Sequence, residues 1–370
     1  MKNRKQVYIV DYLGEHCGMH YYDEAMRAIL KTAGDFDVKI LSNFSNDKGV
    51  QPFFKNQYRG NKIAKGISLL RNLARLKSFI KAHPEDIFIY LTYGNSIDIL
   101  FMNIIKANKN HVIDIHEAIA QAIDSNQSLK DKFKRLYSED ICTVISHSTR
   151  TDDFLKEYGY SKERLTVPHF RYIFPKEYDK SSLTPEVLNA PKDDKINLLF
   201  FGNLTDAKGV DILMEAYNLL DKETASKLNL IIAGKDADGS VERVKIAADR
   251  SATILKRHIT DDELRHIYSH SDYLCLPYRK TSQSGILEMA FYFKKPILCT
   301  NVVYFNKTLQ EFPSFGLISE DLTAENYARL LKDAVDNHGK REYFKDSDYA
   351  GYENRKEVEE FKKSFATWAD

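Results

Sequence analysis

Two glycine-containing segments in the second half of the chain carry residue types that bind phosphate. In residues 198–216 an apolar run ends at Gly202, and a polar loop with Asn203 leads to Lys208–Gly209, where an amphipathic helical pattern begins. Glycine at a strand end lets a ligand approach the backbone closely. A helix N-terminus offers unpaired N–H groups and a partial positive charge. Because Lys208 adds a full charge, the segment is suited to a diphosphate, although an ordinary strand–helix turn has the same pattern.

The second segment, residues 274–300, repeats this arrangement. An apolar run ends at Pro277, and a polar loop leads to Ser284, after which a helical pattern carries Glu288 in its first turn. The backbone N–H groups of that turn would be unpaired and could bind phosphate oxygens; they belong to Gly285, Ile286 and Leu287. Glu288 can accept hydrogen bonds from vicinal hydroxyls, as on a ribose. Alternatively it only complements the helix dipole, which is worth roughly 0.3–1 kcal/mol.

The elements around these segments alternate between strand-like and helical patterns. Strands are expected at Val7–Asp11, Val38–Leu41, Ile87–Thr92, Val112–Ile115, Thr143–Ser146, Ile196–Phe201, Leu228–Ala233, Tyr273–Pro277 and Pro296–Thr300. Helices are expected at Tyr21–Lys31, Gly209–Leu220, Asp261–Ser269, Ser284–Phe293 and Asn354–Trp368. Such alternation predicts parallel sheets of the α/β class. The polar stretch Tyr178–Asp194, with two prolines, is typical of a linker.

Length and composition favour a two-domain protein that does not span a membrane. A chain of 370 residues is too long for one ordinary core. No window of about 20 apolar residues exists to span a bilayer, and the short apolar run at the N-terminus does not fit a signal peptide. We therefore expect a cytoplasmic protein. The net charge of +1, together with a basic run that lacks interleaved aromatics, argues against nucleic-acid binding.

The order of motifs in the second half resembles the donor domain of the family-four retaining glycosyltransferases of the GT-B fold. The resemblance covers residues 196–335 and rests on Gly202, Lys208–Gly209, Gly234, Asp261–Pro277, Glu288–Met289–Ala290 and Lys295–Pro296. It implies that Lys208 holds the donor diphosphate and that Glu288 binds the ribose. It also implies two Rossmann-like domains facing a central cleft: residues 1–180 for the acceptor, residues 181–352 for the nucleotide-sugar donor, and a C-terminal helix, 353–370, that returns to the first domain.

Two positions depart from the family pattern. The family often has a glutamate eight positions before the one that corresponds to Glu288, where it contacts the donor sugar, but this chain has Lys280 there. The family also often has an arginine just after the first glycine, where this chain has Asn203. Arg279 or Lys280 are candidates to replace that charge. The identity of the donor sugar therefore stays open.

The first half resembles the family more weakly. The loop after the first strand contains Gly14 and Gly18 before a helical pattern, so it is a candidate to approach the donor. The strand Val112–Ile115 is followed by His116–Glu117. The family has a His-Asp pair at this place, and its histidine lies near the reacting sugar, which makes His116 a candidate catalytic residue. A histidine at a strand end can equally have a structural role.

A basic stretch, residues 59–81, interrupts the α/β pattern of the first half. It contains seven lysines and arginines and no acid, and its apolar residues recur at three- and four-residue spacing. It lies in a half, residues 1–180, with 28 basic and 22 acidic residues. Several family members dock on membranes through such a helix. We therefore predict an amphipathic helix that binds anionic lipid, with a solvated helix packed on the sheet as the alternative.

The resemblance implies a retaining glycosyltransferase that moves a sugar from a nucleoside-diphosphate sugar to a saccharide or lipid-linked hydroxyl acceptor, in cell-surface polysaccharide or glycolipid synthesis. The catalytic candidates are His116, Lys208 and Glu288. No Asp-x-Asp motif stands at a suitable place, so no metal or other cofactor is expected. A nucleotide-sugar 2-epimerase of the same architecture and a catalytically silent sugar-nucleotide-binding protein remain as alternatives.

Overall fold

The computed structural model of the 370-residue chain describes residues 4–14, 18–43, 50–55, 61–105, 108–116, 126–138, 142–172, 174, 177–281 and 284–370. Glu117 and Arg59, which belong to two of the predicted features, lie outside these residues. The chain forms two compact units. The first unit contains Met1–Ile173 and Arg355–Asp370, and the second contains Phe174–Asn354.

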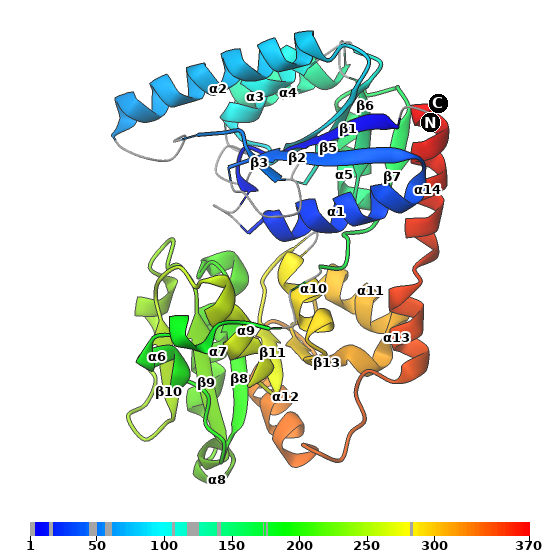
Figure 1. Cartoon of the computed structure of the whole chain (residues 1–370). Coiled ribbons are helices and arrows are strands. Elements are labelled where there is room, and N and C mark those ends of the chain that lie inside the picture. Colours follow the sequence, from blue (N-terminus) through cyan, green and yellow to red (C-terminus); the bar gives the residue numbers. More distant parts are fainter. Residues whose placement is uncertain are drawn as a thin grey trace. The chain divides into compact units, whose positions relative to one another are not determined.

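The first unit is built on a parallel sheet (Figure 1). Its described strands are β1 (Lys5–Val10), β2 (Phe36–Ser42), β3 (Val50–Pro52), β4 (Ile87–Thr92), β5 (His111–Ile115), β6 (Thr143–Ser146) and β7 (Arg164–Thr166). Their order is β3-β2-β1-β4-β5-β6-β7. Every residue of β4 and β5 is buried, as expected for strands covered on both faces. The order reverses between β1 and β4, where open α/β sheets bind ligands at the carboxyl ends of their strands.

Helices cover this sheet. They are α1 (His20–Ala33), α2 (Lys62–Ala82), α3 (Ser96–Ile105), α4 (Gln127–Ser138), α5 (Thr149–Glu157) and α14 (Lys356–Ala369). The C-terminal helix α14 packs on α1 and β7 (Figure 1). Phe365 contacts Phe36 with ring centroids 5.5 Å apart, and the Trp368 indole N–H donates to the Thr143 hydroxyl over 3.0 Å. The predicted return of the last helix to the first domain is therefore confirmed.

The second unit repeats the design. Its described strands are β8 (Ile196–Phe201), β9 (Leu228–Ala233), β10 (Ala252–Leu255), β11 (Tyr273–Leu276), β12 (Ile297–Cys299) and β13 (Gly316–Ile318). They pair in parallel in the order β10-β9-β8-β11-β12-β13, so the switch point lies between β8 and β11. The α-helices are α6 (Pro185–Leu188), α7 (Val210–Leu219), α8 (Lys222–Ser226), α9 (Asp261–Ser269), α10 (Gly285–Tyr292), α11 (Val303–Glu311), α12 (Ala324–Asp336) and α13 (Asp346–Glu353).

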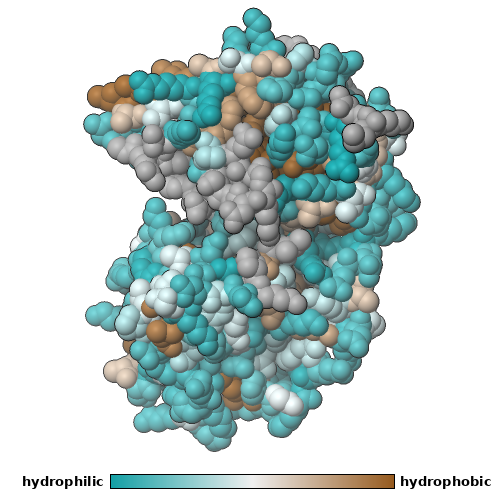
Figure 2. All heavy atoms as spheres, viewed as in Figure 1, coloured by the Kyte–Doolittle hydropathy of each residue, from teal (hydrophilic) through white to brown (hydrophobic). Residues whose placement is uncertain are grey.

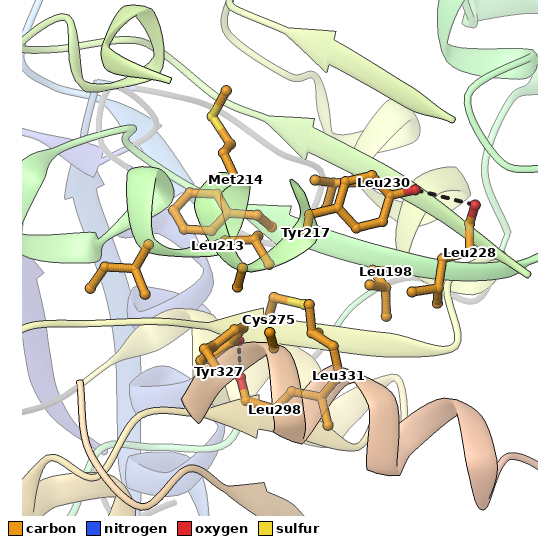
Figure 3. Close-up of a cluster of buried hydrophobic side chains, with 14 of the residues drawn as sticks. Leu198, Leu213, Met214, Tyr217, Leu228, Leu230, Cys275, Leu298, Tyr327 and Leu331 are labelled. Atoms are coloured by element: carbon orange, nitrogen blue, oxygen red, sulfur yellow. Dashed lines mark hydrogen bonds between the residues drawn. The ribbon is translucent and has the colours of Figure 1, made fainter. Parts of the chain in front are cut away.

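The core of the second unit fixes the sheet against α7 and α12 (Figure 3). Leu198 and Leu230 of the sheet pack with Leu213 of α7, and each is at most 1% exposed. Burying an aliphatic side chain of this size contributes about 1.5–3 kcal/mol. Two buried tyrosines donate to carbonyls of strand residues: Tyr327 to Leu298 over 2.5 Å and Tyr217 to Leu228 over 3.3 Å. The loops that follow β8 and β11 thus emerge from a rigid frame.

The predicted α/β class with two Rossmann-like domains is confirmed. The alternating pattern did not predict the strands β3, β7, β10 and β13. Each has three or four residues, and such short strands give no periodic signal. The stretch Tyr178–Asp194, predicted as a linker, contains the 3-10 turn Lys180–Ser182 and α6. The Thr184 hydroxyl accepts from Val187 N, and this cap allows Pro185 to start a helix.

Candidate functional site

Glycines bring the strand ends of the second unit close together at its switch point. Gly202 follows β8 with φ of 121°, and Gly234 follows β9 with φ of 149°. A Cβ on Gly234 would lie 1.8 Å from the Gly202 carbonyl oxygen, and one on Gly209 would lie 2.0 Å from the Pro277 oxygen. Side chains at these positions would clash, so the glycines allow backbone to approach backbone here.

Lys208 reaches over Gly202. It ends a 3-10 turn, Asp206–Lys208, directly before α7. Its Nζ donates to the Tyr278 hydroxyl over 3.0 Å and lies 4.8 Å from the centre of that ring. A Cβ placed on Gly202 would be 3.4 Å from this Nζ. The glycine therefore leaves space beside the ammonium group, and buried Tyr278, which follows Pro277 directly, holds the lysine there.

Arg279 is already paired. It forms a bidentate ion pair with Asp211, with both N···O distances 2.8 Å, and its Nη1 also donates to the Asp206 carbonyl over 2.7 Å. The hydrogen bond with Asp211 raises the pKa of the guanidinium. Arg279 therefore clamps the loop after β11 to the turn that carries Lys208. Lys280 and Asn203, two further predicted donor-binding residues, are exposed.

The start of α10 lies beside the loop that carries Gly202 and Lys208. Ser284 is the N-cap, and its side chain makes no capping hydrogen bond. Its Oγ is buried and has no hydrogen-bond partner among the described residues. The Ile286 side chain would lie 3.5 Å from a Cβ on Gly202, so the start of α10 faces the Gly202–Lys208 loop. An orphaned buried hydroxyl at a helix N-terminus, across from an ammonium group, is suited to an anionic ligand. Gly285 and Leu287 complete this helical turn.

Glu288 sits one turn into α10 and is 1% exposed. The hydroxyl of Tyr352, from α13, donates to its Oε2. The structure thus places Glu288 where the sequence predicts it but beneath the surface, with a tyrosine partner that the sequence analysis did not identify.

In the first unit, the loop after β1 is organised by Asp11. Its carboxylate accepts from the N–H groups of Leu13 and Gly14, over 2.8 and 2.7 Å, and from the Tyr93 hydroxyl over 2.7 Å. Gly14 and Gly18 both have positive φ, 44° and 77°. Burial raises the pKa of Asp11, and that of the neighbouring Asp23 well above its ordinary value. The two predicted glycines therefore shape a turn at the switch point of the first sheet.

His116 follows β5 and is enclosed by aromatic rings. Its ring lies 4.2 Å from Tyr22, 5.7 Å from Tyr93 and 5.0 Å from His147 between centroids. Its Nε2 is 3.7 Å from the Asp114 carboxylate. The ring orientation is therefore fixed by packing.

Asp114 is the centre of a buried network under His116. His147 Nε2 lies 2.5 Å from one carboxylate oxygen and the Tyr22 hydroxyl donates to the other over 2.7 Å. Burial alone would raise the pKa of Asp114, but the charges of His147 and His116 hold that pKa below its ordinary value. His147 was not among the predicted site residues, because its sequence context gives no sign of this partner.

Asp114, His116 and His147 also form the candidate metal cluster of the described residues, since their ligand atoms lie within 4.8 Å of one another. His147 Nδ1, however, lies 3.0 Å from the Val167 carbonyl, so both of its ring nitrogens face acceptors. Both ring nitrogens of His147 are thus engaged by protein groups.

Among the described residues no helix is both long enough and apolar enough to cross a bilayer. The predicted basic helix is α2, whose N-cap Asn61 accepts from Ala64 N. One face of α2 packs on the core of the first unit through Leu69, Leu73 and Leu76. Ile63, Ile67 and Leu70 remain 74%, 45% and 67% exposed. Figure 2 shows hydrophobic side chains gathered at that end of α2.

Comparison with known proteins gives one family match, in the second half of the chain. Residues 184–350 match the family model of the glycosyl transferases group 1. A search of curated proteins gives no sequence match. The solved structure of sucrose-phosphate synthase from Thermosynechococcus elongatus is 13% identical, with a TM-score of 0.64 over 99% of this chain and 96% of that one.

Two other solved structures are similar to the same extent. WaaG, a glycosyltransferase involved in lipopolysaccharide biosynthesis, is 16% identical, with a TM-score of 0.65 over 97% of this chain and 98% of that one. HepE from Anabaena, in complex with UDP-glucose, is 13% identical, with a TM-score of 0.66 over 98% of both chains. At these identities the likeness shows the fold, which is the GT-B fold, and the match of residues 184–350 to the glycosyl transferases group 1 family supports a glycosyltransferase.

Proposed function

We propose that this protein transfers a sugar from a nucleoside-diphosphate sugar to a hydroxyl acceptor with retention of the anomeric configuration, in the synthesis of a surface polysaccharide or glycolipid. One observation carries the proposal: Lys208, the space left at Gly202 and the orphaned hydroxyl of Ser284 converge at the switch point of the second unit. This group is suited to a diphosphate. The complex of HepE with UDP-glucose shows that the fold accommodates such a donor in that protein.

In the proposed reaction the bond between the sugar's anomeric carbon and the phosphate oxygen breaks, and a bond to the acceptor oxygen forms on the same face. The acceptor's proton leaves with the diphosphate. Lys208 and the N-terminus of α10 stabilise the negative charge that develops on the leaving group, as fixed dipoles and charges do in other enzymes. Glu288 binds the ribose and His116 contacts the transferred sugar. Because Lys208 supplies the positive charge, we propose that no metal is required.

A panel of nucleoside diphosphates tests the donor assignment. We expect one of them to raise the unfolding temperature, because a ligand at 100 times its dissociation constant stabilises the folded state by about 2.7 kcal/mol. Product formation that depends on an added acceptor is then expected from the matching nucleotide sugar. Acceptor-independent release of a free product would favour an epimerase, and binding without turnover would favour a silent binding protein. If no nucleotide shifts the transition, the diphosphate site is wrong.

We further propose that α2 docks on an anionic membrane surface and brings a lipid-linked acceptor to the enzyme. With 3.6 residues per turn, the exposed residues Ile63, Ile67 and Leu70 share one face, about a third of a turn from the buried leucines. Lys77 and Lys81 continue the exposed face and are themselves exposed. An apolar stripe with lysines along it is complementary to a bilayer of anionic lipids.

Co-sedimentation with vesicles tests this surface. The protein should bind phosphatidylglycerol-containing vesicles and not pure phosphatidylcholine vesicles, and binding should weaken as salt rises. Reversing Lys77 and Lys81 to Glu should weaken binding by about thirtyfold or more, because each basic residue near such a surface contributes about 1 kcal/mol. Arg75 is left intact, since it donates to the Phe53 carbonyl over 2.8 Å.

The matched control is the pair Lys132→Glu and Lys134→Glu, on α4, where both lysines are exposed. This pair makes the same change in net charge away from α2. Equal losses in both variants would point to a general charge effect, and wild-type protein that ignores anionic vesicles at low salt would make α2 a solvated structural helix.

A further inference from the structure

Tyr352 connects a helix outside the predicted motifs to the first turn of α10. It lies near the end of α13 and is 2% exposed. Its ring packs on Phe291, Phe312 and Phe315, with centroids 5.2, 5.9 and 5.6 Å away. Because these contacts come from different elements of the second unit, the position of the ring is fixed by packing rather than by its hydroxyl.

The hydroxyl of this fixed ring donates to Oε2 of Glu288, and both residues are buried. A carboxylate that accepts such a bond has one oxygen held, which restricts the rotation of the carboxylate plane. Hydrogen bonds to ionised groups are about twice as strong as those between neutral groups. A residue 64 positions later in the chain therefore contributes to the orientation of Glu288.

We infer that Tyr352 is a positioning residue that orients Glu288 toward the ribose of the donor, and that through it the enzyme distinguishes ribonucleotides from 2′-deoxyribonucleotides. The inference rests on the proposed function, in which Glu288 accepts hydrogen bonds from the vicinal hydroxyls of the ribose. A buried acceptor aimed at a hydroxyl penalises an analogue that lacks it, because the acceptor is then left unpaired. A carboxylate that can rotate loses part of this selectivity.

Calorimetry with matched nucleotides tests the role. The ligands are UDP, ADP and GDP, each with its 2′-deoxy analogue, and the variants are Tyr352→Phe, Glu288→Ala and the double variant. Phenylalanine keeps the packing of the ring and removes only the hydroxyl. The matched control is Tyr268→Phe, because the buried Tyr268 hydroxyl has no hydrogen-bond partner among the described residues.

We expect Tyr352→Phe to weaken binding of the preferred ribonucleotide by about tenfold, the equivalent of one hydrogen bond to a charged group. Affinity for its 2′-deoxy analogue should change much less. The ratio of the dissociation constant of the 2′-deoxy analogue to that of the ribonucleotide should therefore fall toward one. The double variant should bind no more weakly than Glu288→Ala alone, because Tyr352 acts through Glu288. Tyr268→Phe should keep the wild-type ratio.

The outcomes separate this inference from the proposed function. If Glu288→Ala loses affinity but Tyr352→Phe keeps the wild-type ratio, Tyr352 is a structural residue and the proposed function stands. If neither variant changes binding, Glu288 does not meet the ribose, and both assignments fail. If Tyr352→Phe and Tyr268→Phe lose affinity equally for both nucleotides, the effect is a general loss of packing and the inference is overturned.

Discussion

Lys208→Ala is expected to lower the rate of glycosyl transfer at saturating donor by about a hundredfold or more, while donor affinity falls by a smaller factor. The Nζ of Lys208 stands beside the space at Gly202 and is held there by Tyr278. Negative charge on the leaving diphosphate grows as the glycosidic bond breaks, so the ammonium group stabilises the transition state more than the bound donor. Removing one preorganised donor from an oxyanion site typically costs a factor of about 10²–10³ in the rate constant.

The rate constant and the Michaelis constant have to be measured separately, because a residue that only binds the donor would raise the second and leave the first unchanged. Lys307→Ala is the matched control, since Lys307 is an exposed lysine on α11 of the same unit. The wild type should keep its rate in the presence of a metal chelator. Full turnover of Lys208→Ala at saturating donor would show that the diphosphate charge is stabilised elsewhere.

The sequence predicted the parts of this site that are local in the chain. Strand ends followed by glycine and a polar loop are visible in a short window, and Gly202, Lys208 and Ser284 are found at such places in the structure. The basic stretch was predicted as a helix over residues 59–81, and α2 spans Lys62–Ala82. These features depend on helix and strand periodicity and on turn chemistry, which a single sequence records.

The parts that it could not predict are contacts between distant positions. Arg279 was a candidate for the donor, but its partner Asp211 lies 68 residues earlier and neutralises it. His147 and Tyr22 meet at Asp114 from different elements. No local pattern marks such pairs, because they can be recognised only when the order of the strands in the sheet is known. The role of Tyr278 could have been predicted from the sequence, because an aromatic residue directly after a strand end at a switch point is a candidate to position a neighbouring lysine.

Glu288→Ala is expected to weaken binding of the preferred nucleoside diphosphate by about tenfold to a hundredfold in calorimetry, because hydrogen bonds to a charged group contribute about 1.5–3 kcal/mol. The same substitution leaves the buried Tyr352 hydroxyl without Glu288 as its acceptor. It should therefore also lower the free energy of unfolding, by about 1–3 kcal/mol.

Glu288→Gln separates the two effects, since its amide oxygen can still accept from Tyr352 while the negative charge is lost. If Glu288 binds the ribose, both variants lose affinity, but only the alanine variant unfolds at a clearly lower temperature. If Glu288 merely complements the dipole of α10, the glutamine variant binds the nucleotide as the wild type does. Glu325→Ala provides the control, because Glu325 occupies the first turn of α12 and is exposed, and its loss should leave nucleotide affinity unchanged. A glutamine variant with wild-type affinity would therefore remove Glu288 from the donor site and leave it a structural acid under α13.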